Sequence, residues 1–405
     1  MKKQILFLMI ALVGFVVGSI GLWDRLTTGH ANAAYGSYVP WGLWVAEYIY
    51  FIGLSAGAFL LSTLVYVFNI RRLEKIGKLA LLTALITLFA AMFAISLDLG
   101  HPERVLKIMF QTNFRSIMGW MLWFYTAYFI LLLVEFWVAI RADLAAQGKQ
   151  NALARFLTFG RTDTSEAAVA ADRRTLRILG SLGVPLAIAF HGGVGALFGV
   201  IGARPFWNSG LTPIIFLVGA LASGGALLTF LTAFFGPDQG SDEHRELVLF
   251  LGKIVLGLLA FDLLLEWAEY SIIYYASIPA HMDALRLVLF GPYWWVFWLV
   301  HLGLGVIVPI FLLTVSRRSV LAVGIAGFLV ASTFISVRLN LVIPALALPE
   351  LQGLENAFSG PGLTFQYFPS STEWLVAAWI PSLAVLIFLA ALRWLPVLTQ
   401  PKEVA

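Results

Sequence analysis

Ten long apolar runs dominate this sequence, and each is long enough to form a helix that crosses a membrane. Crossing the hydrocarbon core of a bilayer takes about 20 mainly apolar residues. A helix also satisfies its backbone hydrogen bonds within its own segment, which hydrocarbon requires because it contains no water. We therefore predict an all-α, polytopic transmembrane bundle that forms one integral-membrane domain over residues 1–405. The expected helices lie near 4–22, 43–68, 77–98, 117–140, 178–202, 211–235, 248–275, 293–315, 319–343 and 373–395.

The composition excludes several classes of protein. Of the 405 residues, 60% are apolar and 12% are charged, about half the charged share of a soluble domain. A net charge of +4 would suit a nucleic-acid partner only if the basic residues shared one face, but they are scattered over short loops. Since the chain has no Cys, it cannot supply thiolate ligands to a metal or an iron–sulfur cluster. We expect no nucleic-acid partner and no metal site.

The distribution of Lys and Arg predicts the orientation in the membrane. Alternate loops and helix ends carry 19 basic residues in one set and 6 in the other, with Arg338 left inside a helix. The richer set includes both ends of the chain. Because cytoplasmic loops are enriched in Lys and Arg, we expect both termini in the cytoplasm. The first run, near 4–22, is longer than a cleaved signal peptide requires and is expected to remain.

Two connections are long, and they differ in character. Residues 141–177 are polar and basic and are predicted to be cytoplasmic. Residues 344–372 are predicted to be extracytoplasmic, lack Lys and Arg, and are rich in Pro, Gly, Leu and Phe. The second connection is either a docking surface or an ordinary surface loop. The last predicted helix follows a capping-box sequence, Ser370-Ser371-Thr372-Glu373.

Two segments of the sequence resemble each other. The stretch from Leu54 to Leu64 matches the stretch from Leu221 to Leu231 at five of eleven positions, with small residues facing small ones. The match fits two four-helix units, helices two to five and six to nine, with one further helix at each end. Chance similarity between two helices rich in Leu and Gly is the alternative.

Ionisable side chains inside the predicted spans gather toward the extracytoplasmic half. Each costs a few kcal/mol to insert, so each is a candidate functional residue. Glu47 and Tyr48 lie in the outer third of the second span, and Asp98 ends the third. His191 lies near the middle of the fifth span, and His301 lies in the outer half of the eighth.

The seventh span carries three acids on one helical face. Asp262, Glu266 and Glu269 follow one another at i, i+4 and i+7, with Lys253 toward the inner end of the span. Three ionised carboxylates would not be stable in lipid, so some must be protonated, hydrated or paired, for example with Arg338. The acids form either a proton path or a static hydrogen-bonded network.

Buried His and carboxyl side chains in the extracytoplasmic half of the membrane suit a site that reduces or oxidises quinone. Reducing a quinone moves two protons with two electrons, so its site needs an apolar slot and a few groups that exchange protons. A haem b bound by this chain would need a pair of His ligands at matching depth, and His191 with His301 is the one such pair. We do not expect a haem there, because a buried His more often serves as a hydrogen-bonding core residue.

Several motifs then identify a resemblance to the NrfD-like family, the membrane subunits of polysulfide reductase and related quinone-linked complexes. The resemblance covers residues from about 38 to 395. The motifs are Pro40-Trp41-Gly42-Leu43-Trp44 with the stretch Gly53 to Gly57, Leu97-Asp98-Leu99-Gly100-His101-Pro102-Glu103-Arg104, Asn113-Phe114-Arg115-Ser116, His191-Gly192-Gly193-Val194-Gly195, Arg204-Pro205-Phe206-Trp207-Asn208, and Tyr367-Phe368-Pro369-Ser370 before Glu373.

This resemblance implies a membrane anchor in a multisubunit respiratory oxidoreductase of the prokaryotic cytoplasmic membrane. Such a protein binds menaquinone or ubiquinone, is not catalytic alone, and carries no redox group of its own. Its partner is an extracytoplasmic, ferredoxin-like iron–sulfur subunit and, through it, a catalytic or multihaem subunit. Electrons then pass between that partner and the quinone, and proton translocation is a further expectation.

The predicted quinone site combines both lines of reasoning. His191 and Asp98 are expected to hydrogen-bond the quinone head and exchange protons, while Glu47 and Tyr48 orient it. The matched motifs add His101 and Arg204. The predicted proton path consists of Asp262, Glu266, Glu269 and Arg338. Two alternatives stay open: a secondary transporter or ion-conducting protein, since buried acids and a repeat also suit a carrier, and a passive scaffold without quinone chemistry.

Overall fold

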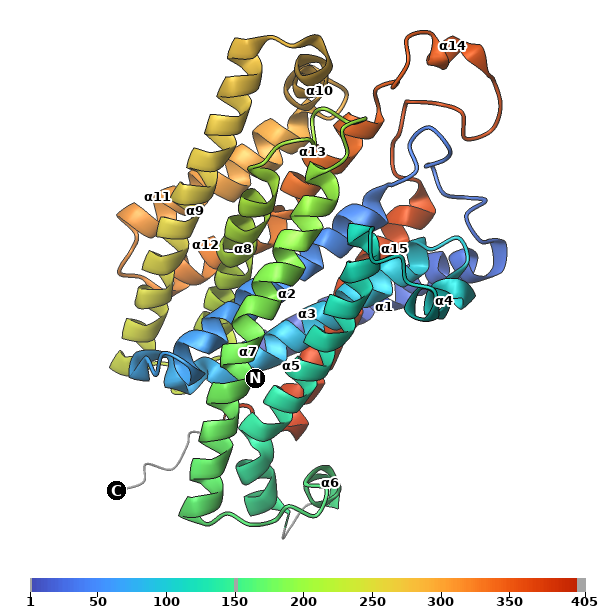
Figure 1. Cartoon of the computed structure of the whole chain (residues 1–405). Coiled ribbons are helices and arrows are strands. Elements are labelled where there is room, and N and C mark those ends of the chain that lie inside the picture. The colour runs from blue at the N-terminus through green and yellow to red at the C-terminus, as the bar shows by residue number, and fades with distance from the viewer. Residues whose placement is uncertain (1, 149–151, 399–405) are drawn as a thin grey trace.

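The computed structural model describes residues 2–148 and 152–398, and this part of the chain contains helices and no strand (Figure 1). Ten helical segments in the described ranges are long and apolar enough to cross a membrane. The predicted all-α polytopic bundle is therefore confirmed. The spans are α1 (Lys2–Thr28), α2 (Leu43–Tyr66), α3 (Gly77–Asp98), α5 (Ile117–Gln147), α7 (Glu166–Gly199), α8 (Thr212–Phe235), α9 (Asp242–Ala276), η3 with α11 (Val296–Ile307, Val308–Val315), α12 with α13 (Val320–Thr333, Ile335–Leu346) and α15 (Ser371–Trp394).

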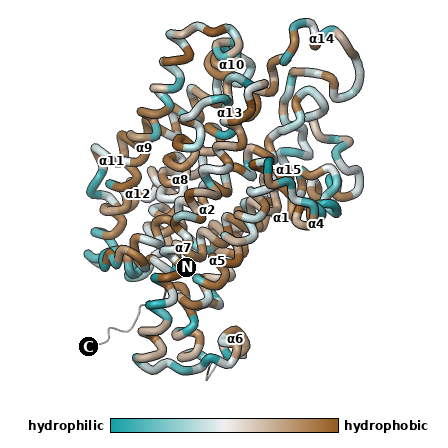
Figure 2. Tube along the Cα trace, in the orientation of Figure 1, coloured by the Kyte–Doolittle hydropathy of each residue, from teal (hydrophilic) through white to brown (hydrophobic). Residues whose placement is uncertain are grey.

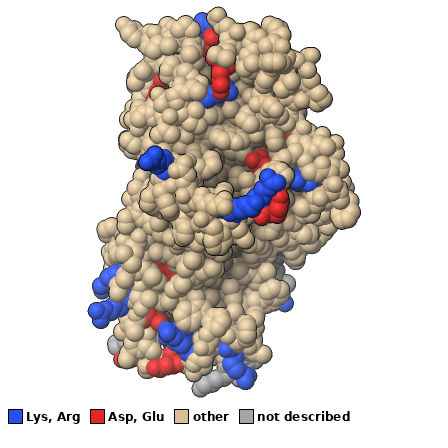
Figure 3. All heavy atoms as spheres, turned by 45° about the vertical axis from the view of Figure 1, so that its right-hand side comes forward, with Lys and Arg blue, Asp and Glu red and all other residues tan. Residues whose placement is uncertain are grey.

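Hydrophobic residues run along these spans, and hydrophilic residues concentrate at their ends and in the connections (Figure 2). Most of the face in Figure 3 is uncharged, with Lys, Arg, Asp and Glu gathered into a few clusters. Such a surface suits lipid and not water, so the chain is a multi-pass integral membrane protein. Of the basic residues counted for the orientation, Lys149 and Lys402 lie outside the described residues.

Several spans extend beyond the predicted apolar runs. The fifth span begins at Glu166 and the seventh at Asp242, each more than one turn before the prediction. A serine caps each start: the Ser165 hydroxyl accepts from the amide of Ala168 at 3.3 Å, and the Ser241 hydroxyl accepts from that of His244 at 3.0 Å. Charged residues continue these helices outside the apolar core, which a hydropathy pattern does not reveal.

The eighth and ninth spans are irregular. Residues Val296–Ile307 form a π-helix that carries His301, and Pro309 follows in α11. The ninth span divides at Phe334 into α12 and α13. Proline has no amide hydrogen to donate, and π-helical turns are frequent at functional sites. This irregular backbone carries His301, whose ring contacts Glu266 of α9.

Short helices fill the connections, and α10 (Pro279–Phe290) is the longest of them. It was not predicted, because its 12 residues are too few to cross a membrane. It contacts α9 and α13 and buries Ala284, Leu285 and Val288. The other short helices are η1 (Arg71–Ile76), η2 (Pro102–Arg104), α4 (Val105–Phe110), α6 (Ala152–Leu157) and α14 (Leu354–Ala357).

The two similar segments cross each other at the centre of the bundle. Gly57 of α2 and Gly224 of α8 occupy equivalent positions in the two segments, and a Cβ atom on Gly57 would lie 2.9 Å from Gly224 Cα. Only glycine allows two helix backbones to approach so closely. α2 also packs on α3 and α7, and α8 packs on α9 and α12, while α7 contacts α8 and α13 contacts α2. The division into two four-helix units remains a prediction.

The first and last spans pair with each other. α1 packs along α15, and α15 also contacts α3. The close contact follows from small residues on α1, since a Cβ atom on Gly18 would lie 2.6 Å from Trp379 Cβ. The predicted capping box at the start of α15 is present, with Ser370 and Glu373 as its two members.

Candidate functional site

Glu47 and Tyr48 lie side by side in the sequence of α2 but have different surroundings. Glu47 is buried, and its Oε2 atom has no hydrogen-bond partner among the described residues. The Tyr48 ring stacks on Tyr125 of α5 with 5.9 Å between ring centres. Tyr125 in turn meets the edge of Phe190 on α7 at 4.4 Å. Tyr48 of α2, Tyr125 of α5 and Phe190 of α7 thus form an aromatic wall.

His191 of α7 lies between α2 and α8. Its Nε2 atom is 2.7 Å from the carbonyl oxygen of Phe216. Because a carbonyl oxygen only accepts, Nε2 carries the proton, and Nδ1 of the neutral ring is an acceptor. Nδ1 is buried without a partner in the described structure. Gly53 of α2 faces the ring: a Cβ atom there would lie 3.7 Å from His191 Cε1. The imidazole therefore offers one free acceptor inside the bundle.

The structure places Asp98 in a cluster at the C-terminal ends of α1 and α3. Arg25 of α1 donates to the carbonyl oxygens of Leu97 at 2.6 Å and Leu99 at 2.8 Å. These bonds hold the guanidinium beside Asp98, whose Oδ1 atom is buried without a hydrogen-bond partner in the part of the chain that is described. Tyr35 completes this cluster. Burial, together with the charge of Asp98, raises the pKa of Tyr35 above its usual value.

Sequence reasoning missed the partners of Asp98. His30 packs edge-on against Tyr35, with 5.4 Å between ring centres. Burial and the positive charge of Arg25 lower the pKa of His30, which favours its neutral form. These residues precede the second span and have no helical periodicity, so the only available signal was their position just outside α2.

Glu373 joins the last matched motif to the start of the second span. Its Oε1 atom accepts from the Tyr367 hydroxyl at 2.6 Å, and its Oε2 atom accepts from the amides of Ala34 and Ser370, each at 2.9 Å. The Tyr367 hydroxyl also accepts from the amide of Leu43 at 2.7 Å. Burial and the Glu373 charge raise the pKa of Tyr367. This network ties the start of α2 to the start of α15.

His101 and Arg204 contact other residues than those around His191. His101 is exposed in the connection after α3, with Nδ1 3.1 Å from Glu103 Oε1. Arg204 donates to the carbonyl oxygens of Ala345 and Leu348 at 2.9 Å and 2.7 Å, and it pairs with Glu350 at 2.8 Å. The Arg204 guanidinium thus fastens the connection before α8 to the end of α13. The structure gives both side chains roles outside the aromatic wall.

The three acids of α9 and Arg338 of α13 line one cavity of about 70 Å³. This arrangement agrees with the helical spacing of the acids and with Arg338 as their neighbour. Asp262 is buried, and Glu269 accepts from the Ser209 hydroxyl at 3.2 Å. The other lining residues are Phe206, Thr212, Ile215, Phe216, Tyr270, Phe334, Val337 and Leu341.

The middle acid of the cavity has a histidine partner. Glu266 Oε2 lies 2.7 Å from His301 Nε2, the π-helical histidine. His191 and His301 thus direct their Nε2 atoms at different partners, a backbone carbonyl and a carboxylate. The Arg338 Nε and Nη2 atoms have no hydrogen-bond partner within the described residues, and the guanidinium lies 4.3 Å from the centre of the Phe216 ring.

Glu135 of α5 is a buried acid that the sequence reasoning overlooked. It is fully buried, and neither carboxyl oxygen has a hydrogen-bond partner in the described part of the chain. A Cβ atom on Gly180 of α7 would lie 3.3 Å from its Oε1 atom. The sequence signal that could have identified Glu135 was its position as a single carboxyl residue inside an apolar run. Among the described residues, no group of three or more His, Asp or Glu side chains is arranged to hold a metal ion.

Comparison with known proteins gives one family. Residues 30–350 match the family described as "Polysulphide reductase, NrfD". The chain is also similar to a selenate reductase subunit of Mesobacillus selenatarsenatis. The two are 39% identical over 100% of this chain and 96% of the relative.

Two more distant relatives are named for a quinone. The Hdr-like menaquinol oxidoreductase integral membrane subunit of Archaeoglobus fulgidus is 29% identical over 88% of this chain and 84% of the relative. The menaquinone reductase integral membrane subunit of Nitratidesulfovibrio vulgaris is 23% identical over 100% of this chain and 94% of the relative.

Proposed function

Because the chain belongs to the NrfD polysulphide reductase family, we propose that it is the quinone-reactive membrane subunit of a multisubunit respiratory oxidoreductase. It anchors an extracytoplasmic iron–sulfur subunit and exchanges electrons between that partner and membrane quinone. Two relatives are named for menaquinol or menaquinone, which favours this quinone class over ubiquinone. Since the chain has no Cys to ligate a cluster, electrons would reach quinone from a cluster in the partner.

The observation that carries this proposal is the free Nδ1 atom of His191. It is a buried acceptor next to Gly53, in a bundle that also contains the aromatic wall of Tyr48 and Tyr125. An acceptor in apolar surroundings binds a hydroxyl or takes a proton as charge develops on the ligand. Glu47 supplies a second proton-exchanging group on α2. Asp98 belongs to the separate cluster with Arg25 and Tyr35 at the end of α3, and we propose it as a further proton-exchanging group there.

The cavity around Arg338 is the proposed proton path. Asp262, Glu266 and Glu269 line it in order along α9, and His301 binds the middle acid. A carboxylate paired with an imidazole passes a proton between two atoms 2.7 Å apart, so this contact is a natural relay step. The path reaches toward the outside through Ser209, which donates to Glu269. Both termini are proposed to face the cytoplasm, on the basis of the Lys and Arg distribution.

Quinone retention tests the assignment directly. The complex is extracted in mild detergent, its retained proteins are identified, and its bound quinone is quantified by chromatography. We expect an iron–sulfur protein with the wild-type chain, and a loss of at least half of the bound quinone in His191→Ala. His244→Ala is the matched control, because His244 is also buried but contacts the Pro237 carbonyl at the cytoplasmic end of α9. Solute uptake by the isolated chain in liposomes, with no retained redox protein, would instead identify a carrier.

A further inference from the structure

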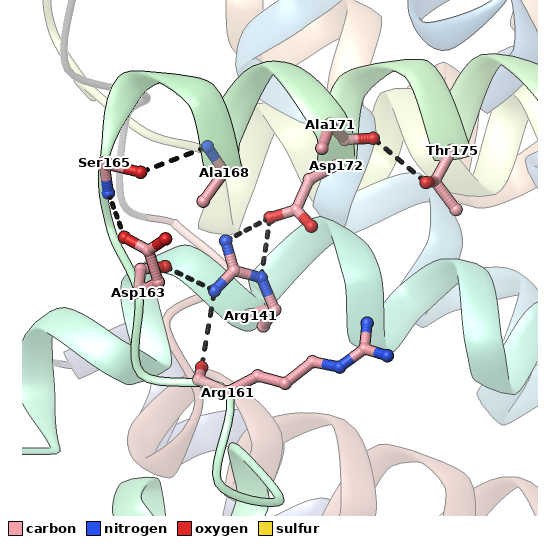
Figure 4. A network of polar contacts seen from close by, with 8 residues as sticks. All are labelled: Arg141, Arg161, Asp163, Ser165, Ala168, Ala171, Asp172 and Thr175. Carbon is pink, nitrogen blue, oxygen red and sulfur yellow. Dashed lines mark hydrogen bonds and ion pairs between the residues drawn. The ribbon is translucent and has the colours of Figure 1, made fainter.

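The connection between α5 and α7 folds back onto the side of α5. The indole nitrogen of Trp137 donates to the carbonyl oxygen of Leu157 at 2.8 Å. One turn later, Arg141 donates to the carbonyl oxygens of Arg161 at 3.3 Å and Asp163 at 2.6 Å (Figure 4). Two helical residues thus bind three backbone carbonyls of the connection, which fixes α6 and the residues after it against α5.

Both sides of this attachment are themselves held in place. Arg141 Nε lies 2.7 Å from Asp172 Oδ2 on α7, and Nη2 forms an ion pair with the same oxygen at 2.6 Å. The Asp163 carboxyl group accepts from the amide of Ser165, and Ser165 caps α7 (Figure 4). Since Arg141 is 3% exposed, these bonds are sheltered from water. The connection is a built structure and not a loose loop.

The depth of this structure follows from α5. Ile130, Leu133 and Val134 form an exposed apolar stripe on α5. In a membrane protein such a stripe faces lipid. Trp137 continues the stripe at i+7 from Ile130, and Arg141 is the first basic residue of this helix. Tryptophan at the end of an apolar stripe, followed by arginine, is typical of the boundary between lipid tails and headgroups. The connection therefore rests on the lipid-facing side of α5 at this boundary.

Two aromatic side chains project from the connection. Phe156 is 71% exposed and Phe159 is 70% exposed, and their ring centres are 6.2 Å apart. Phe159 has a φ of +49°, in the left-handed region that a bulky residue rarely adopts. Phe159 follows the end of α6, where a left-handed residue commonly ends a helix, so the surrounding backbone fixes this conformation. Both rings remain exposed, and an exposed phenyl ring is unfavourable in water.

We propose that this connection is a membrane hook. Phe156 and Phe159 insert among the acyl chains next to Trp137, and the exposed Arg155 and Arg161 bind the phosphates of anionic lipids at the same face. The Arg161 guanidinium lies 5.7 Å from the centre of the Trp137 ring, at the boundary defined above. The continuity of the rings with the α5 stripe favours lipid over a soluble protein as the occupant. Lipid insertion of amphipathic elements with basic residues has this pattern.

Because this chain has no Cys, an introduced cysteine is its single site for a spin label, and the complex without it gives the background from partner subunits. A label is placed at Phe159→Cys in the full complex, reconstituted in vesicles of phosphatidylcholine with phosphatidylglycerol. We expect the label to collide more with oxygen, which concentrates in lipid, than with a water-soluble nickel chelate. Ala170→Cys is the control, because Ala170 is exposed on the first turns of α7, outside the apolar run. Equal collision with the nickel chelate at both positions would overturn the proposal, and protection from both reagents would indicate a protein occupant instead.

Lipid retention tests the basic half of the hook. The double variant Arg155→Gln with Arg161→Gln should retain at least threefold less phosphatidylglycerol after detergent extraction, measured by mass spectrometry. Arg115→Gln, an exposed arginine at the opposite membrane face, should retain the wild-type amount. Unchanged retention in the double variant would contradict the headgroup contact. Because neither readout involves quinone, failure here is separable from failure of the proposed function.

Discussion

His191 Nε2 donates a hydrogen bond to the carbonyl oxygen of Phe216 at 2.7 Å, while the ring of the same Phe216 packs against the Arg338 guanidinium. One residue of α8 thus contacts both the proposed quinone ligand and the cation of the acidic cavity. A proton gained by His191 places a second positive charge near Arg338 in a medium of low dielectric constant. The added positive charge would attract the carboxylates around the cavity, which gives the two proposed sites a physical means of communication.

Asp262→Asn tests the proposed proton path. The change removes the innermost titratable group of the cavity, whereas the His191 contacts stay intact. In proteoliposomes, we expect quinone turnover to remain within about twofold of wild type while the membrane potential that it generates falls severalfold. Asp283→Asn, an exposed acid on α10, is the control and should change neither quantity. An undiminished potential in Asp262→Asn would remove the α9 acids from the mechanism.

The close crossing of α2 and α8 predicts that alanine destabilises the protein at Gly57 but not at Gly257. In Gly57→Ala, the new Cβ atom would meet Gly224 Cα at 2.9 Å, so the helices must separate. We expect a loss of about 1–3 kcal/mol in the free energy of unfolding, as in other overpacked interiors. Gly257→Ala on α9 has open space around its Cβ atom and should be neutral or slightly stabilising. Thermal unfolding in detergent measures both; equal midpoints would show that the close crossing is not needed.

Stability should fall at alkaline pH because of Tyr367. Its pKa in the folded protein is raised by burial and by Glu373, above the value of about 10 in the unfolded chain. Below pH 10 both states keep the proton, and above it the unfolded state releases its proton first. The free energy of unfolding should therefore decrease above about pH 10, by about 1.4 kcal/mol per pH unit for each such tyrosine.

Tyr367→Phe isolates this contribution. The variant should be less stable at neutral pH, because Glu373 and the Leu43 amide each lose a hydrogen-bond partner. Its stability should also fall less steeply above pH 10, as measured by unfolding midpoints across the pH range. The exposed Tyr275 is the control, and Tyr275→Phe should keep the wild-type slope. An identical slope in Tyr367→Phe would show that another group titrates.

The sequence is informative about the spans because the bilayer imposes one length and one solvent on them. It does not predict the division of the ninth span at Phe334 or the π-helix around His301, since these depend on packing between helices. The sequence also indicates how deep in the membrane a residue of a span lies, but it does not indicate which neighbouring helix the side chain faces. Asp98 and His191 both lie within predicted spans, yet Asp98 lies with Tyr35 and Arg25, and His191 bonds to α8.

The cavity was more predictable than the aromatic wall. Asp262, Glu266 and Glu269 belong to one helix, so their spacing alone places them on one face. The wall joins Tyr48 of α2 to Tyr125 of α5, and nothing in a single sequence specifies which helices become neighbours.

Quinone turnover of the purified complex with and without His191 tests the central claim most directly. The two activities to compare are electron transfer between the soluble partner and a menaquinone analogue, and electron transfer between that partner and an artificial dye. His191→Ala should reduce the first by at least tenfold and leave the second unchanged, with Asp98→Asn as a second variant of the proposed site. His244→Ala should affect neither. Wild-type quinone turnover in both His191→Ala and Asp98→Asn would contradict the account.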